Sequence, residues 1–66
     1  MNKSEQREVT KLLSVANMGA HDECFVGYAA RGLSALARCS NLKTRNEILA
    51  LAMGVPEVIQ HPDFII

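Results

Sequence analysis

The chain has 66 residues, 48% of them apolar, and its seven basic and seven acidic side chains give a formal net charge of zero. A chain this short buries only about 60% of the surface that its unfolded state exposes, so residues 1–66 can form at most one small domain. The apolar content excludes a disordered protein, and no apolar run approaches the roughly 20 residues that span a bilayer. Residues 1–8 are polar, without a signal-peptide pattern, so we expect a cytoplasmic protein.

The first predicted helix covers residues 4–18. Its apolar residues recur at the spacing of one helical stripe: Val9, Leu12, Leu13, Ala16 and Ala20. Asn2 paired with Glu5, or Ser4 alone, can cap its first turn, and Gly19 is expected to end it. This helix is amphipathic and therefore needs another element to lie against.

A second helix is predicted from His21 or Asp22 to Cys39, and it carries two apolar ridges. Such a helix is either central in a bundle or faces a second subunit. Gly27 and Gly32 weaken a helix and therefore indicate close approach of another backbone. Because the apolar half of the chain exceeds what one helical hairpin can bury, we predict a homodimer. The predicted self-association residues are Phe25, Tyr28, Ala29, Gly32, Ala35 and Leu36.

The third predicted helix begins at Thr44, whose side chain would form a capping box with Glu47, and it ends at Gly54. A short turn then runs from Pro56 until Pro62 ends it. The fold class is therefore all-α: a helical hairpin, a third helix and a short C-terminal turn, forming a small bundle completed by dimerisation. The predicted core consists of Val9, Leu12, Leu13, Phe25, Ala29, Leu33, Leu36, Ile48, Leu49 and Met53.

Residues 49–55, Leu-Ala-Leu-Ala-Met-Gly-Val, resemble the first helix and turn of a helix-turn-helix motif. That resemblance implies an alternative function for the chain, a small dimeric nucleic-acid-binding regulator that would use residues 44–61. The segment departs from the motif where bases would be read, because a recognition helix runs about three turns along the major groove. Here Pro62 cuts off residues 56–61, which carry the carboxylate of Glu57 but no arginine or lysine, and Gln60 stands where a branched residue is usual.

Charge is unevenly distributed along the chain, with net values of −1, +4 and −3 over residues 1–23, 24–46 and 47–66. Arg31 and Arg38 lie seven residues apart and so share a helix face. A dimer would double this basic region, which could attract phosphates or an acidic protein surface. The predicted partner-binding residues are Arg31, Arg38, Lys43 and Arg45, together with Phe64 and Ile65 of the apolar tail.

His21 and Cys24 have a spacing that can hold a metal, and His61 could add a third ligand. Structural zinc takes four ligands and usually more cysteines, so we predict no metal and no other cofactor. Cys24 and Cys39 are about 22 Å apart along one helix and cannot form a disulfide with each other. We expect both to be small buried apolar residues; in an antiparallel helix pair centred near Arg31 and Gly32, Cys24 of one copy would approach Cys39 of the other.

Catalytic patterns are lacking in the sequence. Its serines have no neighbouring histidine and acid, and it contains neither a P-loop nor a dinucleotide fingerprint. We therefore predict a non-enzymatic interaction protein that acts as a regulator, inhibitor or adaptor by binding another protein. Small helical proteins of this kind include accessory proteins of bacteriophages and other mobile elements.

Overall fold

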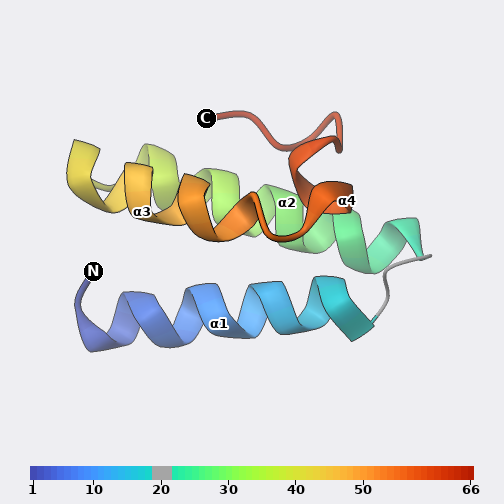
Figure 1. Ribbon diagram of the computed structural model, residues 1–66, viewed down its shortest axis with the longest axis horizontal. Helices are drawn as coiled ribbons and strands as arrows, with labels where there is room; N and C mark the ends of the chain where they lie inside the picture. Colours follow the sequence, from blue (N-terminus) through green and yellow to red (C-terminus); the bar gives the residue numbers. More distant parts are fainter. Residues whose placement is uncertain (19–21) are drawn as a thin grey trace.

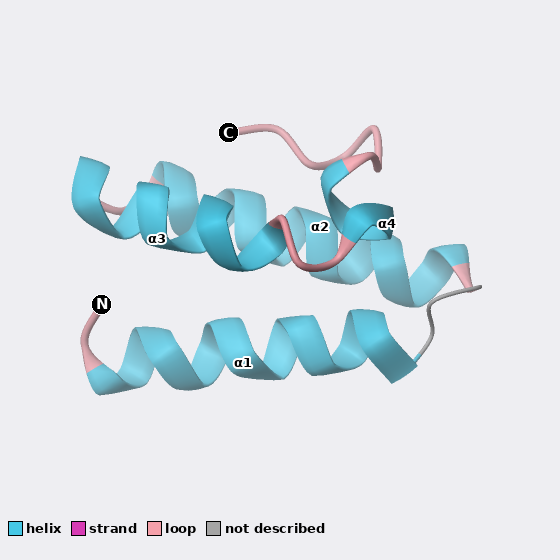
Figure 2. Ribbon diagram, in the orientation of Figure 1, coloured by secondary structure: helices cyan, strands magenta, loops and turns pink. Residues whose placement is uncertain are grey.

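The computed structural model describes residues 1–18 and 22–66, and every regular element there is a helix (Figures 1 and 2). The helices are α1 (Lys3–Met18), α2 (Glu23–Arg38), α3 (Leu42–Ala52) and α4 (Pro56–Ile59). The all-α prediction is confirmed, whereas the predicted stop at Gly19 lies outside the described residues. None of these helices is both long and apolar enough to cross a membrane.

Helix α2 is the centre of the fold and contacts each of the other three helices. Helices α1 and α2 run antiparallel as a hairpin, and α3 returns along α2 in the opposite direction (Figure 1). Helix α4 follows α3, and the C-terminal tail, residues 60–66, turns back above it (Figure 1). One of the two predicted ridges of α2 is accordingly buried inside the chain: Val26, Ala30, Leu33 and Ala37.

The start of α1 is held by a reciprocal pair of hydrogen bonds. The backbone N–H of Glu5 donates to Oδ1 of Asn2 at 2.8 Å, and the backbone N–H of Asn2 donates to Oε1 of Glu5 at 3.0 Å. This pairing satisfies two backbone donors that the first turn of a helix leaves free. The predicted capping role of Asn2 and Glu5 is therefore confirmed.

Helix α3 begins earlier than predicted, because Asn41 and not Thr44 caps it. The side chain of Asn41 accepts a hydrogen bond from the backbone N–H of Thr44 at 2.8 Å. Thr44 lies inside the first turn and is buried, so the predicted capping box from Thr44 to Glu47 is wrong. Asparagine ranks at or above threonine as a cap.

Replacing Asn41 with alanine is expected to lower the free energy of unfolding by about 1 kcal/mol, since the amide of Thr44 loses its acceptor. Urea denaturation followed by circular dichroism would measure the change. Asn46→Ala is the matched control, because Asn46 is exposed in the middle of α3 and alanine favours a helix there. An Asn41→Ala variant as stable as the control would contradict this assignment of the cap.

The core is built mainly from small and medium side chains, and its largest fully buried members are Leu33, Ile48, Val9 and Val58. The predictions for Phe25 and Met53 are wrong, since these side chains are 45% and 70% exposed. Phe25 lies on the ridge of α2 away from the buried one, and Met53 is the C-cap of α3. Five predicted core residues are buried: Val9, Leu12, Ala29, Leu33 and Ile48. Three more are half-buried: Leu13, Leu36 and Leu49.

Candidate protein-interaction site

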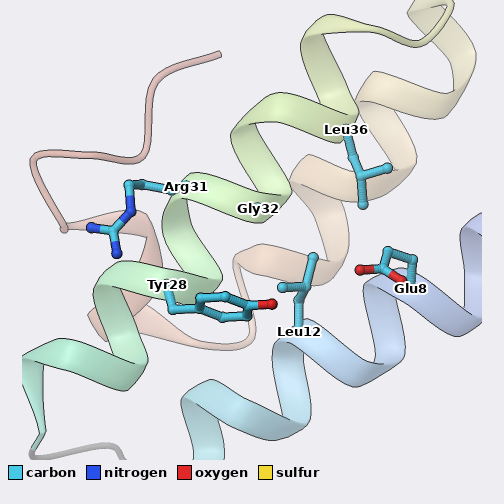
Figure 3. A pocket seen from close by; sticks show the side chains of 6 residues that line it. All are labelled: Glu8, Leu12, Tyr28, Arg31, Gly32 and Leu36. Atoms are coloured by element: carbon cyan, nitrogen blue, oxygen red, sulfur yellow. The ribbon is translucent and has the colours of Figure 1, made fainter.

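An apolar groove runs between α1 and α2 on the outer side of the hairpin. It consists of two adjoining hollows that share Tyr28. The first, of about 400 Å³, is lined by Lys11, Val15, Cys24, Phe25 and Tyr28. The second, of about 480 Å³, is lined by Glu8, Leu12, Tyr28, Arg31, Gly32 and Leu36 (Figure 3). These two sets of residues together are called the groove below.

Two aromatic side chains line the groove, and one of them, Tyr28, belongs to both hollows. Phe25 is 45% exposed and Tyr28 is 54% exposed, and they lie one turn apart on the same face of α2. The ring of Tyr28 extends from α2 toward Leu12 on α1 (Figure 3). Aromatic residues usually supply much of a core, yet in the part of the chain that the structure describes none is fully buried. Two of the three aromatic side chains, Phe25 and Tyr28, are therefore presented to the outside.

Gly32 lies where the side chain of Leu12 on α1 packs against α2. A Cβ atom at this position would be 2.7 Å from Cδ2 of Leu12, well inside van der Waals contact. The glycine thus allows the side chain of Leu12 to pack directly on the backbone of α2, and it leaves a depression in the wall of the groove. Close approach at Gly32 was expected from the sequence, and here it is an approach between two helices of the same chain.

The structure separates the six predicted self-association residues into three groups. Four line the groove: Phe25, Tyr28, Gly32 and Leu36. Ala35 is exposed on α2 next to Leu36, whereas Ala29 is completely buried in the core. Ala29 can therefore support the groove from beneath, but it offers no surface of its own to a partner.

The predicted basic residues lie in two different places. Arg31 turns away from Tyr28 and Leu12 (Figure 3), and its Nη1 atom lies 3.0 Å from Oδ2 of Asp63 in the tail. The other three, Arg38, Lys43 and Arg45, surround the connection between α2 and α3. There Arg45 donates from Nε to the backbone oxygen of Ala37 at 3.4 Å, while Arg38 and Lys43 are exposed.

The apolar tail is bound along α2. Phe64 is half-buried and packs against the core, while the backbone N–H of Ile65 donates to Oγ of Ser34 at 2.9 Å. Ser34 is itself fully buried, so the tail covers this part of α2. Of the two tail residues predicted to contact a partner, Phe64 is engaged within the chain and Ile65 keeps its side chain 59% exposed.

Both cysteines are exposed, and the prediction that they are buried is wrong. Cys24 stands in the first turn of α2 at the edge of the groove, and Cys39 is the C-cap of the same helix.

His61 packs against α2 with its side chain only 11% exposed. Its Nδ1 atom accepts a hydrogen bond from the backbone N–H of Asp63 at 3.0 Å, and its Nε2 atom lies 3.9 Å from Oε1 of Glu23. His21, the other histidine considered for a metal, lies outside the described residues. Within residues 1–18 and 22–66, no three His, Cys, Asp or Glu side chains are grouped as metal ligands would be.

The segment that resembles a helix-turn-helix motif ends in α4, which has only four residues. That length provides a single helical turn, whereas a recognition helix extends over several turns of a major groove. Glu57, which is exposed on α4, would face phosphates with a negative charge. The geometry of this segment therefore gives the nucleic-acid alternative no specific support.

The contribution of α1 to the groove was missed from the sequence. Glu8, Lys11 and Val15 line it, and their spacing of three and four residues is the signal that they share one helix face with Leu12. Which helix this face of α1 contacts depends on how the hairpin folds, so the local sequence could not predict it.

Comparisons with protein families, curated proteins and solved structures found no match. A proposal about what the chain does must therefore be argued from the chemistry of this surface.

Proposed function

We propose that the chain is a non-enzymatic protein-interaction module, a small regulator, inhibitor or adaptor of the cytoplasm, that binds a complementary apolar protein surface through the groove. The observation that carries this proposal is that two aromatic side chains are exposed while smaller apolar side chains form the core. The core consists largely of alanine, valine and leucine, while Phe25 and Tyr28 stand exposed beside each other. Exposed apolar patches of this kind mark interaction sites in small proteins.

The groove has the composition of an interaction site. Its centre is apolar, formed by Leu12, Val15 and the two aromatic rings, while Glu8 and Lys11 provide charged groups along α1. Binding sites between proteins characteristically combine an apolar centre with a polar rim. Tyrosine is enriched among the residues that carry most of the binding energy, and Tyr28 occupies the middle of the groove.

The cysteines support a reducing compartment as the place of action. Cys24 and Cys39 are exposed free thiols, and thiols of this kind persist in the cytosol rather than in secreted proteins. Cys24 lies next to Phe25 at the groove, so its oxidation would alter the surface that a partner meets.

Replacing Phe25 and Tyr28 together with serine is expected to reduce retention of a bound protein at least about tenfold, because the apolar centre of the site is lost. The chain would be immobilised, exposed to a lysate of its source organism, and the retained proteins quantified by mass spectrometry. The readout is the ratio between wild type and variant for each retained protein, including further copies of the chain itself.

Leu51→Ser combined with Met53→Ser is the matched control, since it removes two exposed apolar side chains from α3, away from the groove. This control should retain the same proteins as the wild type. Both variants must keep their helical circular dichroism. A set of retained proteins that is the same for the groove variant and for the wild type would overturn the proposed function.

A further inference from the structure

We infer that the face of α2 formed by Gly27, Arg31 and Ser34 is a peptide-binding site whose resident ligand is the chain's own tail. A partner segment of the same chemistry, an extended stretch with a carboxylate directly before an aromatic residue, can take the place of the tail. This face is called the tail site below. The inference goes beyond the proposed function, because Gly27 and Ser34 do not line the groove.

Two polar side chains of the tail site hold the tail along α2. Nη1 of Arg31 lies 3.0 Å from Oδ2 of Asp63. Two residues further along the tail, the backbone N–H of Ile65 donates to Oγ of Ser34 at 2.9 Å. Between these two contacts, Phe64 is half-buried against the core. Because Arg31 and Ser34 lie one turn apart on one face of the helix, alternate residues of an extended segment contact successive turns of α2.

These contacts define the ligand by its chemistry. Oγ of Ser34 accepts a backbone N–H, a group that nearly every residue of a peptide offers. Arg31 favours a carboxylate two residues before that N–H, and the place taken by Phe64 favours an aromatic ring between them. Backbone hydrogen bonds combined with pockets for particular side chains are a common basis for recognising extended peptides.

The tail is an imperfect ligand at the third position of its site. His61 lies against Gly27, where a Cβ atom would be 3.3 Å from Nε2 of the ring. This Nε2 atom is buried and has no hydrogen-bond partner among residues 1–18 and 22–66, since Oε1 of Glu23 at 3.9 Å is too distant to accept from it. A buried polar group without a partner costs free energy. A partner segment with an apolar side chain at this place avoids that cost.

The tail can leave without stranding a polar group on α2. The hydroxyl of Ser34 has one proton to donate, and the backbone oxygen of Ala30, at 2.7 Å, lies closer to it than that of Asp63, at 3.3 Å. Ser34 therefore keeps its own hydrogen bond within the helix when the tail departs. The ion pair of Arg31 and Asp63 is exposed on both sides and contributes little to holding the tail. Departure of the tail is thus a local opening that leaves the helices in place.

An NMR titration with a peptide tests the tail site. The probe is the acetylated and amidated peptide His-Pro-Asp-Phe-Ile-Ile, which has the sequence of residues 61–66. The full chain carrying Asp63→Ser and Phe64→Ser, called the opened chain, should bind the probe with a dissociation constant below about 1 mM and shift the amide signals of Gly27, Arg31 and Ser34. The wild-type chain should bind it at least about tenfold more weakly, because its tethered tail competes at a millimolar effective concentration.

Two arginines of α2 provide a matched pair of variants in the opened chain. Arg31→Gln should raise the dissociation constant of the probe about two- to fivefold, as loss of an exposed ion pair does. Arg38→Gln removes an equally charged and exposed side chain seven residues further along α2 and should leave it unchanged. A probe with asparagine for aspartate and alanine for phenylalanine should bind the opened chain at least about tenfold more weakly.

A second opened chain, Asp63→Asn with Ile65→Pro, keeps Phe64 and removes the N–H that Ser34 accepts. It replaces the first if circular dichroism shows that the first has lost its helices. A probe that does not bind the opened chain in the millimolar range overturns this inference, and so do equal affinities for the opened and wild-type chains. Amide shifts confined to the groove overturn the location of the site. Retention of a protein through the groove is measured separately, so the proposed function does not depend on these results.

Discussion

Replacing Leu33 with alanine is expected to lower the free energy of unfolding by about 2–5 kcal/mol. Leu33 is the largest fully buried side chain and lies on the buried ridge of α2, the helix that contacts all the others. Removing three carbons there takes apolar surface out of the core and leaves a cavity among side chains that cannot fill it, since several neighbours are alanines.

The expected loss is large in relation to the whole stability of the domain. At about 0.05–0.15 kcal/mol per residue, a chain of 66 residues has roughly 3–10 kcal/mol in total. The Leu33→Ala variant should therefore show a substantial unfolded population before any denaturant is added. Urea titration followed by helical circular dichroism measures this directly as a shifted midpoint.

Leu51→Ala provides the comparison for this prediction. Leu51 belongs to α3 and is 46% exposed, so its truncation should change the free energy of unfolding by less than about 1 kcal/mol. The chemical change is the same in both variants, and only the burial of the leucine differs. Equal midpoints for the two variants would contradict the position of Leu33 at the centre of the core.

The helices could be predicted from the sequence because their signals are local. The apolar stripe of α1, the pair Asn2 and Glu5 at its start, and Asp22 before α2 each act within one or two turns. The start of α3 shows the limit of such reasoning. Asn41 and Thr44 are both competent caps, and the local pattern does not decide between them.

Which ridge of α2 faces inward could not be predicted, because both ridges are apolar. Size suggested that Phe25 belongs to the core, yet the structure buries Val26 on the adjoining ridge and leaves Phe25 outside. Small side chains such as Ala30 and Ala37 allow α3 and α4 to pack close to α2, and a large ring would hold them apart. Tertiary packing therefore decides which ridge of α2 is buried, and the groove lies along the ridge that stays outside.

The role of the tail also depends on contacts between distant parts of the sequence. Asp63 pairs with Arg31 across 32 positions, and Ile65 reaches Ser34 across 31. No periodicity links these residues, so the sequence presented Arg31 as a free cation and the tail as a free apolar segment. Charge counts along the chain thus predicted the basic region but not its internal partner.

Gly32→Leu is expected to lower the thermal midpoint by about 10 °C or more, because a leucine here would push α1 away from α2. Even the Cβ atom of the new side chain would lie 2.7 Å from Cδ2 and 3.0 Å from Cδ1 of Leu12. Overpacking of this kind forces side chains off their rotamers or shifts the backbone. The measurement is a thermal melt in dilute solution, where a contribution from a second copy is smallest.

Gly54→Ala is the control for a glycine replaced without a clash, since a Cβ atom there meets its nearest neighbour at an ordinary 3.4 Å. It should leave the midpoint nearly unchanged.

Exchanging the side-chain sizes at positions 12 and 32, where α1 contacts α2, tests why Gly32→Leu destabilises the chain. Leu12→Ala alone should destabilise the chain by leaving a cavity, since Leu12 is only 3% exposed. In the double variant, Leu12→Ala should remove the clash and Gly32→Leu should supply the missing volume. Its free energy of unfolding should therefore exceed, by about 1 kcal/mol or more, the value expected from adding the losses of the two single variants. Strictly additive losses would show that Leu12 does not pack on Gly32.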